Sequence, residues 1–152
     1  MAKTTIQGGD KGFDLDAFLP YQLSVLAGRV SRGLAAIYRE RYGISVPEWR
    51  VLAHLLQSGR ASVREIHARA DMDKSKVSRA AAKLERSGFV TKRADPDDGR
   101  LVVLMLTPKG ETLMSEIIPL ALDYEGAALE ALGAQDAALF RAMLERLLEK
   151  TE

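Results

Sequence analysis

Apolar side chains recur at helical spacing along most of this 152-residue chain, and two short runs of β-prone residues interrupt them past its midpoint. Between residues 15 and 41 the apolar positions repeat every three or four residues, which predicts a helix with Pro20 in its first turn or at a kink. Residues 89–93 and 101–106 favour strands, and the Pro-Asp-Asp-Gly sequence between them is a strong turn signal. The pattern predicts a mainly α-helical fold with a small β-hairpin.

The segment that precedes the hairpin, residues 73–88, is predicted to be a helix with two contrasting faces. Asp73 can cap its first turn, and Gly88 supplies the left-handed residue on which many helices end. One side is apolar and is formed by Val77, Ala80, Ala81 and Leu84. The other side carries small, hydroxyl and basic residues, namely Lys74, Ser75, Lys76, Ser78, Arg79, Ala82, Lys83 and Arg86.

The polar side of this helix suits a DNA groove. Small residues at Ser75, Ser78 and Ala82 allow a helix to lie close to base edges. Arg79 can offer two parallel hydrogen bonds to guanine, or it can reach a phosphate. A solvated amphipathic helix shows the same pattern, so the helix alone leaves both interpretations open.

A second, shorter helix is predicted directly before it, over residues 62–70. Ser62 is followed three residues later by Glu65, which is a capping box at the start of a helix. Asp71 and Met72 then leave only a short turn before the next helix. Two short helices joined in this way match the helix-turn-helix arrangement, whose second helix enters the major groove of DNA.

A helix-turn-helix followed by a hairpin is a winged helix, and the hairpin tip here mixes both signs of charge. Its basic residues are Lys92, Arg93 and Arg100, and its acidic residues are Asp95, Asp97 and Asp98. An extended strand would point Asp98 and Arg100 the same way, so Asp98 is expected to orient the Arg100 guanidinium. An arginine held there suits a narrow minor groove, whereas an ordinary solvated turn explains the same residues without DNA.

Two further helices are predicted after the hairpin. Thr107 and Pro108 form a cap and a first turn, and the helix that follows should bend at Pro119 and end near Gly133. The last helix, residues 135–149, has a wide apolar stripe formed by Ala138, Leu139, Phe140, Met143, Leu144, Leu147 and Leu148. A lone surface helix does not need such a width, which indicates a partner helix from a second copy of the chain. A purely intramolecular core is the alternative.

The net charge of +1 argues at first against a nucleic-acid binder, but the charges are unevenly distributed. Residues 60–100 hold 11 lysines or arginines against 7 acids, a net of +4, and residues 107–152 hold 4 against 9, a net of −5. Positive charge is therefore concentrated at the helix-turn-helix. The acidic C-terminal region should lie away from a DNA duplex, because phosphates would repel it.

Composition excludes several classes of protein. The absence of cysteine excludes disulfides and thiol switches, and His54 and His67 alone do not suggest a zinc site, so no metal or cofactor is expected. No nucleophile with a base, carboxylate pair or phosphate loop stands out, so we expect no enzyme. Residues 1–13 look like a flexible tail rather than a signal peptide, and no apolar run reaches membrane-spanning length, which favours a cytoplasmic protein.

Four motifs, taken in order along the chain, resemble the MarR family of transcriptional regulators. They are residues 46–52, residues 77–79 with 84–90, residues 90–100, and residues 106–110, and the resemblance extends over roughly residues 15 to 150. It implies a winged helix-turn-helix DNA-binding domain at residues 45–106, with N- and C-terminal dimerisation helices at residues 14–42 and 108–152. It also implies an obligate homodimer whose recognition helices enter major grooves and whose wings enter the adjacent minor grooves.

Carried over by motif position, the resemblance makes Asp98 and Arg100 the wing pair. It makes Ser75, Lys76, Ser78 and Arg79 the groove-facing residues. We therefore expect a sequence-specific regulator, acting as a repressor on a pseudo-palindromic operator. The alternative is a winged-helix module whose basic face binds protein rather than DNA.

Members of this family commonly bind a small aromatic anion in a crevice between the dimerisation helices and the DNA-binding lobe. The residues expected to border such a crevice here are Tyr38, Tyr42, Trp49, Arg50 and His54. Each of them also fits a role in the core, above all Trp49. The resemblance thus implies a small aromatic or anionic effector as a partner besides double-stranded DNA, and the sequence does not identify it.

Overall fold

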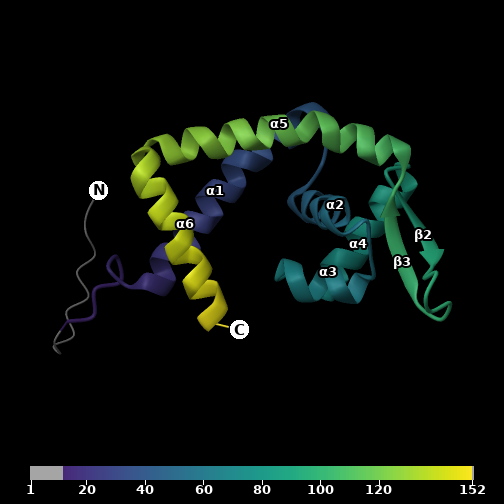
Figure 1. Cartoon of the computed structure of the whole chain (residues 1–152), viewed down its shortest axis with the longest axis horizontal. Coiled ribbons are helices and arrows are strands. Elements are labelled where there is room, and N and C mark those ends of the chain that lie inside the picture. The colour runs from purple at the N-terminus through teal and green to yellow at the C-terminus, as the bar shows by residue number, and fades with distance from the viewer. Residues whose placement is uncertain (1–11, 152) are drawn as a thin grey trace, which may run out of the picture.

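A computed structural model describes residues 12–151, so the predicted tail at residues 1–13 lies almost entirely outside the described part. In chain order the elements are α1 (Leu19–Tyr42), α2 (Val46–Ser58), β1 (Arg60–Ala61), α3 (Val63–Ala70), α4 (Lys74–Arg86), β2 (Val90–Ala94), β3 (Val102–Leu106), α5 (Pro108–Glu130) and α6 (Gly133–Lys150). Figure 1 shows α2, α3, α4 and the sheet gathered in one lobe, with α6 and much of α1 at the other end. The long helix α5 spans both regions. The mainly α-helical fold with a small sheet is confirmed.

Side-chain caps fix where the helices of the lobe begin. Ser45 and Glu48 form a capping box at α2, and Ser62 and Glu65 form the predicted one at α3. The Asp73 carboxylate accepts a hydrogen bond from the Ser75 N–H at the start of α4. These bonds satisfy backbone N–H groups that have no partner inside their helix, so the sequence signals translate directly into helix boundaries.

The hairpin forms as predicted, within one residue at each strand. β2 and β3 are antiparallel, with Val90 opposite Leu106 and Ala94 opposite Val102. A third strand, β1, pairs with the other edge of β3 and places Arg60 opposite Met105. The sequence did not predict β1, because two residues are too few to show an alternating pattern. Its consequence is that Arg60 lies beside the hairpin.

Hydrogen bonds and close packing connect the first turn of α5 to the residues that follow α4. The Thr107 hydroxyl donates to the Gly88 carbonyl oxygen at 2.6 Å, and the Lys109 ammonium donates to the Ser87 carbonyl oxygen at 2.9 Å. A Cβ atom at Gly110 would collide with the carbonyl oxygen of Phe89, so only glycine allows this approach. The long helix is therefore rigidly connected to the lobe.

Beyond that junction, α5 continues through Pro119 as one gently curved helix (Figure 1). It ends at Glu130, and Gly133, with φ of +74°, begins α6 rather than closing α5. Tyr124 of α5 donates a hydrogen bond to the Val30 carbonyl oxygen of α1 at 3.0 Å. Within residues 12–151, no helix is long and apolar enough to cross a membrane.

The core lies in the lobe and at the adjoining ends of α1 and α5. Every buried residue of the described chain falls between Ala35 and Ile117, and α6 buries none. Many large apolar side chains outside that interval are exposed, including Phe18, Leu26 and Leu148. The two ends of the molecule are thus packed very differently.

Candidate nucleic-acid interface

The two predicted faces of α4 are both present. Val77, Ala80, Ala81 and Leu84 are buried in the core, where α4 packs against α2 and α3. The opposite face is exposed and carries Lys74, Ser75, Lys76, Ser78, Arg79, Lys83 and Arg86. Arg93 on β2 is also exposed, as are Asp98 and Arg100 in the turn that follows. The structure therefore brings the predicted DNA-binding residues onto one helix face and the hairpin beside it.

Hydrogen bonds at the turn between α3 and α4 set the angle at which α4 leaves its neighbour. The Nδ1 atom of His67 and the Met72 carbonyl oxygen are 2.5 Å apart. Arg50 of α2 donates through Nη1 to the Ala70 carbonyl oxygen at 3.4 Å. Asp71 adopts a left-handed conformation, with φ of 47°, which an Asp tolerates better than most residues. His67 thus stabilises this turn.

A buried carboxylate joins α2 to α4. Glu48 is only 3% exposed, and its Oε2 atom accepts the Ser45 N–H at 2.9 Å to complete the capping box. Its Oε1 atom lies 2.9 Å from the ammonium of Lys83, whose side chain is 55% exposed. Sequence reasoning missed this pair, because the partners are 35 residues apart and nothing local connects them. Among the described residues, Lys83 is the only cation of the exposed α4 face that pairs with a carboxylate.

The geometry of the hairpin tip corrects one expectation. Asp98 and Arg100 lie in a turn rather than an extended strand, and Asp98 Oδ1 accepts the backbone N–H of Arg100 at 3.1 Å. Among the ion pairs of the described residues, none joins these two side chains. Asp98 therefore does not hold the guanidinium. The tight turn through Gly99 brings the Asp98 carboxylate to the backbone instead.

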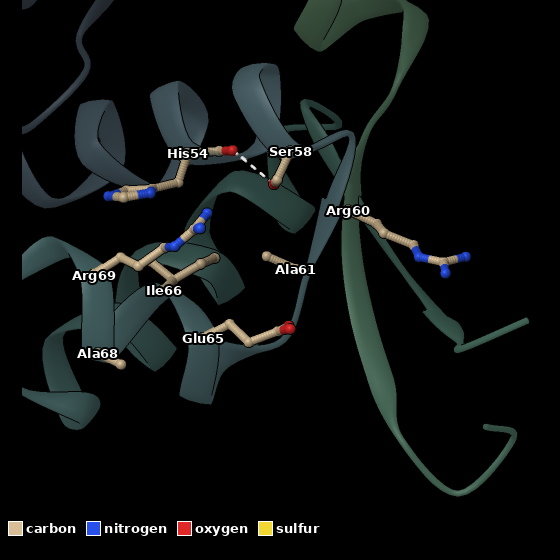
Figure 2. Close-up of a pocket in the computed structure, with 8 residues that line it drawn as sticks. All are labelled: His54, Ser58, Arg60, Ala61, Glu65, Ile66, Ala68 and Arg69. Carbon is tan, nitrogen blue, oxygen red and sulfur yellow. Dashed lines mark hydrogen bonds between the residues drawn. The ribbon is translucent and has the colours of Figure 1, made fainter. Parts of the chain in front are cut away.

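The acids of the tip have a cationic partner that sequence reasoning did not find. Arg60 of β1 pairs through Nη2 with Asp97 Oδ2 at 2.5 Å and lies 3.8 Å from Asp95 Oδ1. The backbone N–H of Asp97, followed by weaker effects that include Arg60, holds the pKa of the Asp95 carboxyl below its usual range. Figure 2 shows the Arg60 side chain extending away from the residues of α2 and α3. The acidic tip is thereby tied to the lobe.

The structure brings only some of the five residues expected to border an effector crevice together. Tyr38 is buried and stacks on Trp49, with ring centroids 5.4 Å apart, and Tyr42 packs against the same core. Arg50 reaches the end of α3, as described above. His54 instead lines a cavity of about 290 Å³ between α2, β1 and α3 (Figure 2). Helical spacing on α2 points Trp49, Arg50 and His54 to different neighbours, and a crevice between the dimerisation helices and the lobe stays a prediction.

Arg69 lines the same cavity and projects from α3 toward His54 (Figure 2). Burial, and then the positive charge of Arg69, lower the pKa of His54 below 6.5. Glu65 also lines the cavity, although its carboxylate is held by the Ser62 N–H at 2.7 Å. The cavity therefore places the Arg69 guanidinium beside an imidazole whose pKa is lowered, while Arg60, which also lines it, extends its side chain away (Figure 2).

Comparison with known proteins agrees with this architecture. The MarR family model matches residues 42–101, which include α2, α3, α4 and the hairpin. Over these residues the chain is a MarR-type winged helix-turn-helix. A solved MarR family transcriptional regulator from Silicibacter pomeroyi is 28% identical, with a TM-score of 0.81 over 93% of this chain and 100% of that one.

Two other relatives extend the comparison. The HTH-type transcriptional repressor IacR of Pseudomonas putida is 28% identical over 64% of this chain, and the chain spans only 58% of that repressor. BpsR of Bordetella bronchiseptica, whose DNA binding is regulated by 6-hydroxynicotinic acid, has a TM-score of 0.79 over 90% of this chain and 97% of its own. At 18% identity, BpsR shows the fold alone. These names are those of regulators rather than enzymes.

Proposed function

We propose that this protein is a sequence-specific DNA-binding transcriptional regulator of the MarR family. The observation that carries the proposal is that α4 buries its apolar side and leaves a hydroxyl and basic side exposed beside the hairpin. In this proposal α4 enters a major groove, where Ser75, Ser78 and Arg79 face base edges. Lys74, Lys76 and Arg86 bind phosphates, and Arg93 and Arg100 of the wing reach the adjacent minor groove.

The proposal includes a homodimer formed by α1, α5 and α6. Apolar side chains on α1 and α6 are exposed in the single chain, among them Leu19, Leu23, Leu139, Met143 and Leu147. Large exposed apolar surfaces are rare on soluble monomers, and a second copy of the same helices would cover these side chains. Two recognition helices would then address half-sites about one DNA turn, roughly 34 to 36 Å, apart. A pseudo-palindromic operator follows from that symmetry, and occupancy of a promoter would make the protein a repressor.

Selection of bound sequences from a pool of random DNA duplexes tests this function. We expect an enriched inverted repeat whose half-sites are separated by about one helical turn. Affinity for the selected duplex should fall steeply with salt, with a log-log slope of about −0.9 per phosphate contacted. If no motif is enriched and binding is weak at every salt concentration, the winged helix serves another purpose, and a module that binds protein becomes the better interpretation.

An effector that releases the DNA is the last part of the proposal. The cavity beside His54 and Arg69 is the place that we favour, because Arg69 can bind a carboxylate and the apolar side chains of Ala61 and Ile66 line the same cavity. The relative BpsR responds to an aromatic acid, which is the same class of ligand. A first probe is 6-hydroxynicotinic acid. We expect it to weaken DNA binding in the wild type and not in Arg69→Met, and an equal effect on both would exclude this cavity.

A further inference from the structure

Glu48 is the one charged residue that the described chain buries, and both of its carboxylate oxygens are occupied. A buried carboxylate is costly unless it is paired and hydrogen-bonded. One oxygen completes the cap of α2, which any surface helix achieves without burial. The other oxygen binds Lys83, and this contact explains why the carboxylate lies between two helices rather than in solvent.

We infer that Glu48 is a positioning residue for DNA recognition, acting through Lys83; the inference rests on the proposed function and deepens it. The contact between α2 and α4 is otherwise made by apolar side chains such as Leu52, Val77 and Ala81, whose attraction has no preferred direction. Apolar packing alone tolerates a small rotation or slide of α4. The ion pair between Glu48 and Lys83 fixes one position, because the carboxylate is itself held by the cap of α2.

Lys83 lies among the α4 residues that we propose to face DNA, so its ion pair with Glu48 bears directly on how α4 contacts the bases. Lys83 follows Arg79 by four residues and precedes Arg86 by three, so the three cations are neighbours on the helix surface. Glu48 offsets the charge of the middle cation and reduces the repulsion among them. In this account Lys83 holds the helix in place, while Arg79 and Arg86 remain available to DNA.

Two accounts of Lys83 can be separated, because they predict opposite effects. If Lys83 were a phosphate contact, removal of the buried negative charge in Glu48→Gln would leave it freer and tighten binding to every duplex. If Glu48 positions α4 through Lys83, the same substitution loosens binding to the selected duplex only. The amide oxygen of glutamine can still accept the Ser45 N–H, so the cap of α2 is retained.

The test measures affinity by fluorescence anisotropy over a series of salt concentrations, for the duplex selected from the random pool and for an unrelated duplex. The variants are Glu48→Gln, Lys83→Met, and both together. Lys76→Met is the matched control, because it removes an exposed cation of the same helix for which no carboxylate of the described residues lies within 4.0 Å. Near-ultraviolet circular dichroism checks that each variant is folded.

We expect each single substitution of the pair to weaken binding to the selected duplex by about tenfold, a coupling that residues in contact commonly show. Affinity for the unrelated duplex should not fall, and the double variant should be no weaker than either single one. The salt slope should be unchanged in Lys83→Met and shallower by about 0.9 in Lys76→Met.

Three results would overturn the inference: tighter binding by Glu48→Gln to both duplexes, a shallower salt slope in Lys83→Met, or additive losses in the double variant. If Glu48→Gln does not fold, Lys83→Met still decides the question, because its side chain is half exposed. The proposed function fails in a different way, since the wild type would then select no sequence at all.

Discussion

Apolar side chains are buried in the lobe, which is formed by α2, α3, α4 and the sheet, and exposed in the arms, by which we mean α6 and the first half of α1. In the lobe, leucine, isoleucine and valine side chains such as Leu52, Ile66 and Val77 are buried completely, and capping boxes close the helix ends. In the arms, α6 and the first half of α1 bury nothing, although their apolar spacing is as regular. The lobe has a closed apolar core, whereas the arms leave large apolar side chains exposed in the single chain.

The lobe and the C-terminal region also differ in the sign of their net charge. Residues 60–100, which lie in the lobe, carry a net charge of +4, and residues 107–152 carry a net charge of −5. A phosphate backbone would attract the first and repel the second. We propose on this basis that the two regions bind different partners, DNA for the lobe and a second copy of the chain for the arms.

The largest effect is expected from removing the last helix. A chain that ends at Leu132 lacks α6 and should be a monomer, and its affinity for a two-half-site duplex should fall by about 100-fold or more because the half-sites are no longer bound together. Light scattering gives the oligomeric state, and a chain that ends at Lys150 is the control. A truncated chain that remains a dimer would show that α6 is not the interface.

A smaller loss is expected from the wing. Replacement of Arg100 by alanine should weaken binding to the selected duplex by about 1 to 3 kcal/mol without unfolding the protein, as for arginines that contact bases in general. Gel-shift titration measures this loss. Arg146→Ala on α6 is the matched control for loss of one exposed arginine outside the proposed DNA-binding surface, with light scattering to confirm that the dimer is intact. Unchanged affinity in Arg100→Ala would remove the wing from the mechanism.

At position 98, DNA binding should depend on a side chain that accepts a hydrogen bond from the Arg100 N–H, and not on the negative charge of Asp98. Asp98→Ala removes the bond to the Arg100 N–H and should weaken DNA binding by about 1 kcal/mol. Asp98→Asn keeps an acceptor and should bind nearly as the wild type does. If both variants bound more tightly, repulsion of phosphate by Asp98 would be its main effect, and the ordering of the turn would be unimportant.

The smallest effect concerns stability and pH. Burial and Arg69 lower the pKa of His54 in the folded protein, so as the pH falls below about 6.5 the unfolded chain takes up this proton first. The free energy of unfolding should therefore decrease between about pH 7.5 and pH 5.5. Urea midpoints should fall less in His54→Gln, with His67→Gln as the control. Equal pH dependence in wild type and His54→Gln would contradict this assignment.

Most of the lobe could be predicted because its signals are local. Caps at Ser62 and Asp73, the left-handed Gly88 and the apolar spacing of α4 all depend on residues a few positions apart. The exposed faces of α4 and α6 followed from the same periodicity. The assignment of the α4 face to DNA and the α6 face to a second copy remains a prediction.

What the sequence did not predict depends on contacts between distant segments. Arg60 meets Asp97 only because the two-residue β1 pairs with β3, and Glu48 meets Lys83 only because α2 packs on α4. Asp98 was expected to orient the Arg100 guanidinium from an extended strand. The chain turns at Gly99 instead, so the Asp98 carboxylate accepts the Arg100 backbone N–H. Spacing along the chain does not determine such contacts.

The most direct test of the account changes the distance between the two half-sites. Insertion of about five base pairs between them turns one half-site to the opposite side of the duplex, since a helical turn is about 10 to 10.5 base pairs. For the full chain we predict that specific binding falls to the affinity for an unrelated duplex. Undiminished affinity for the altered duplex would contradict a dimer that reads both half-sites at once.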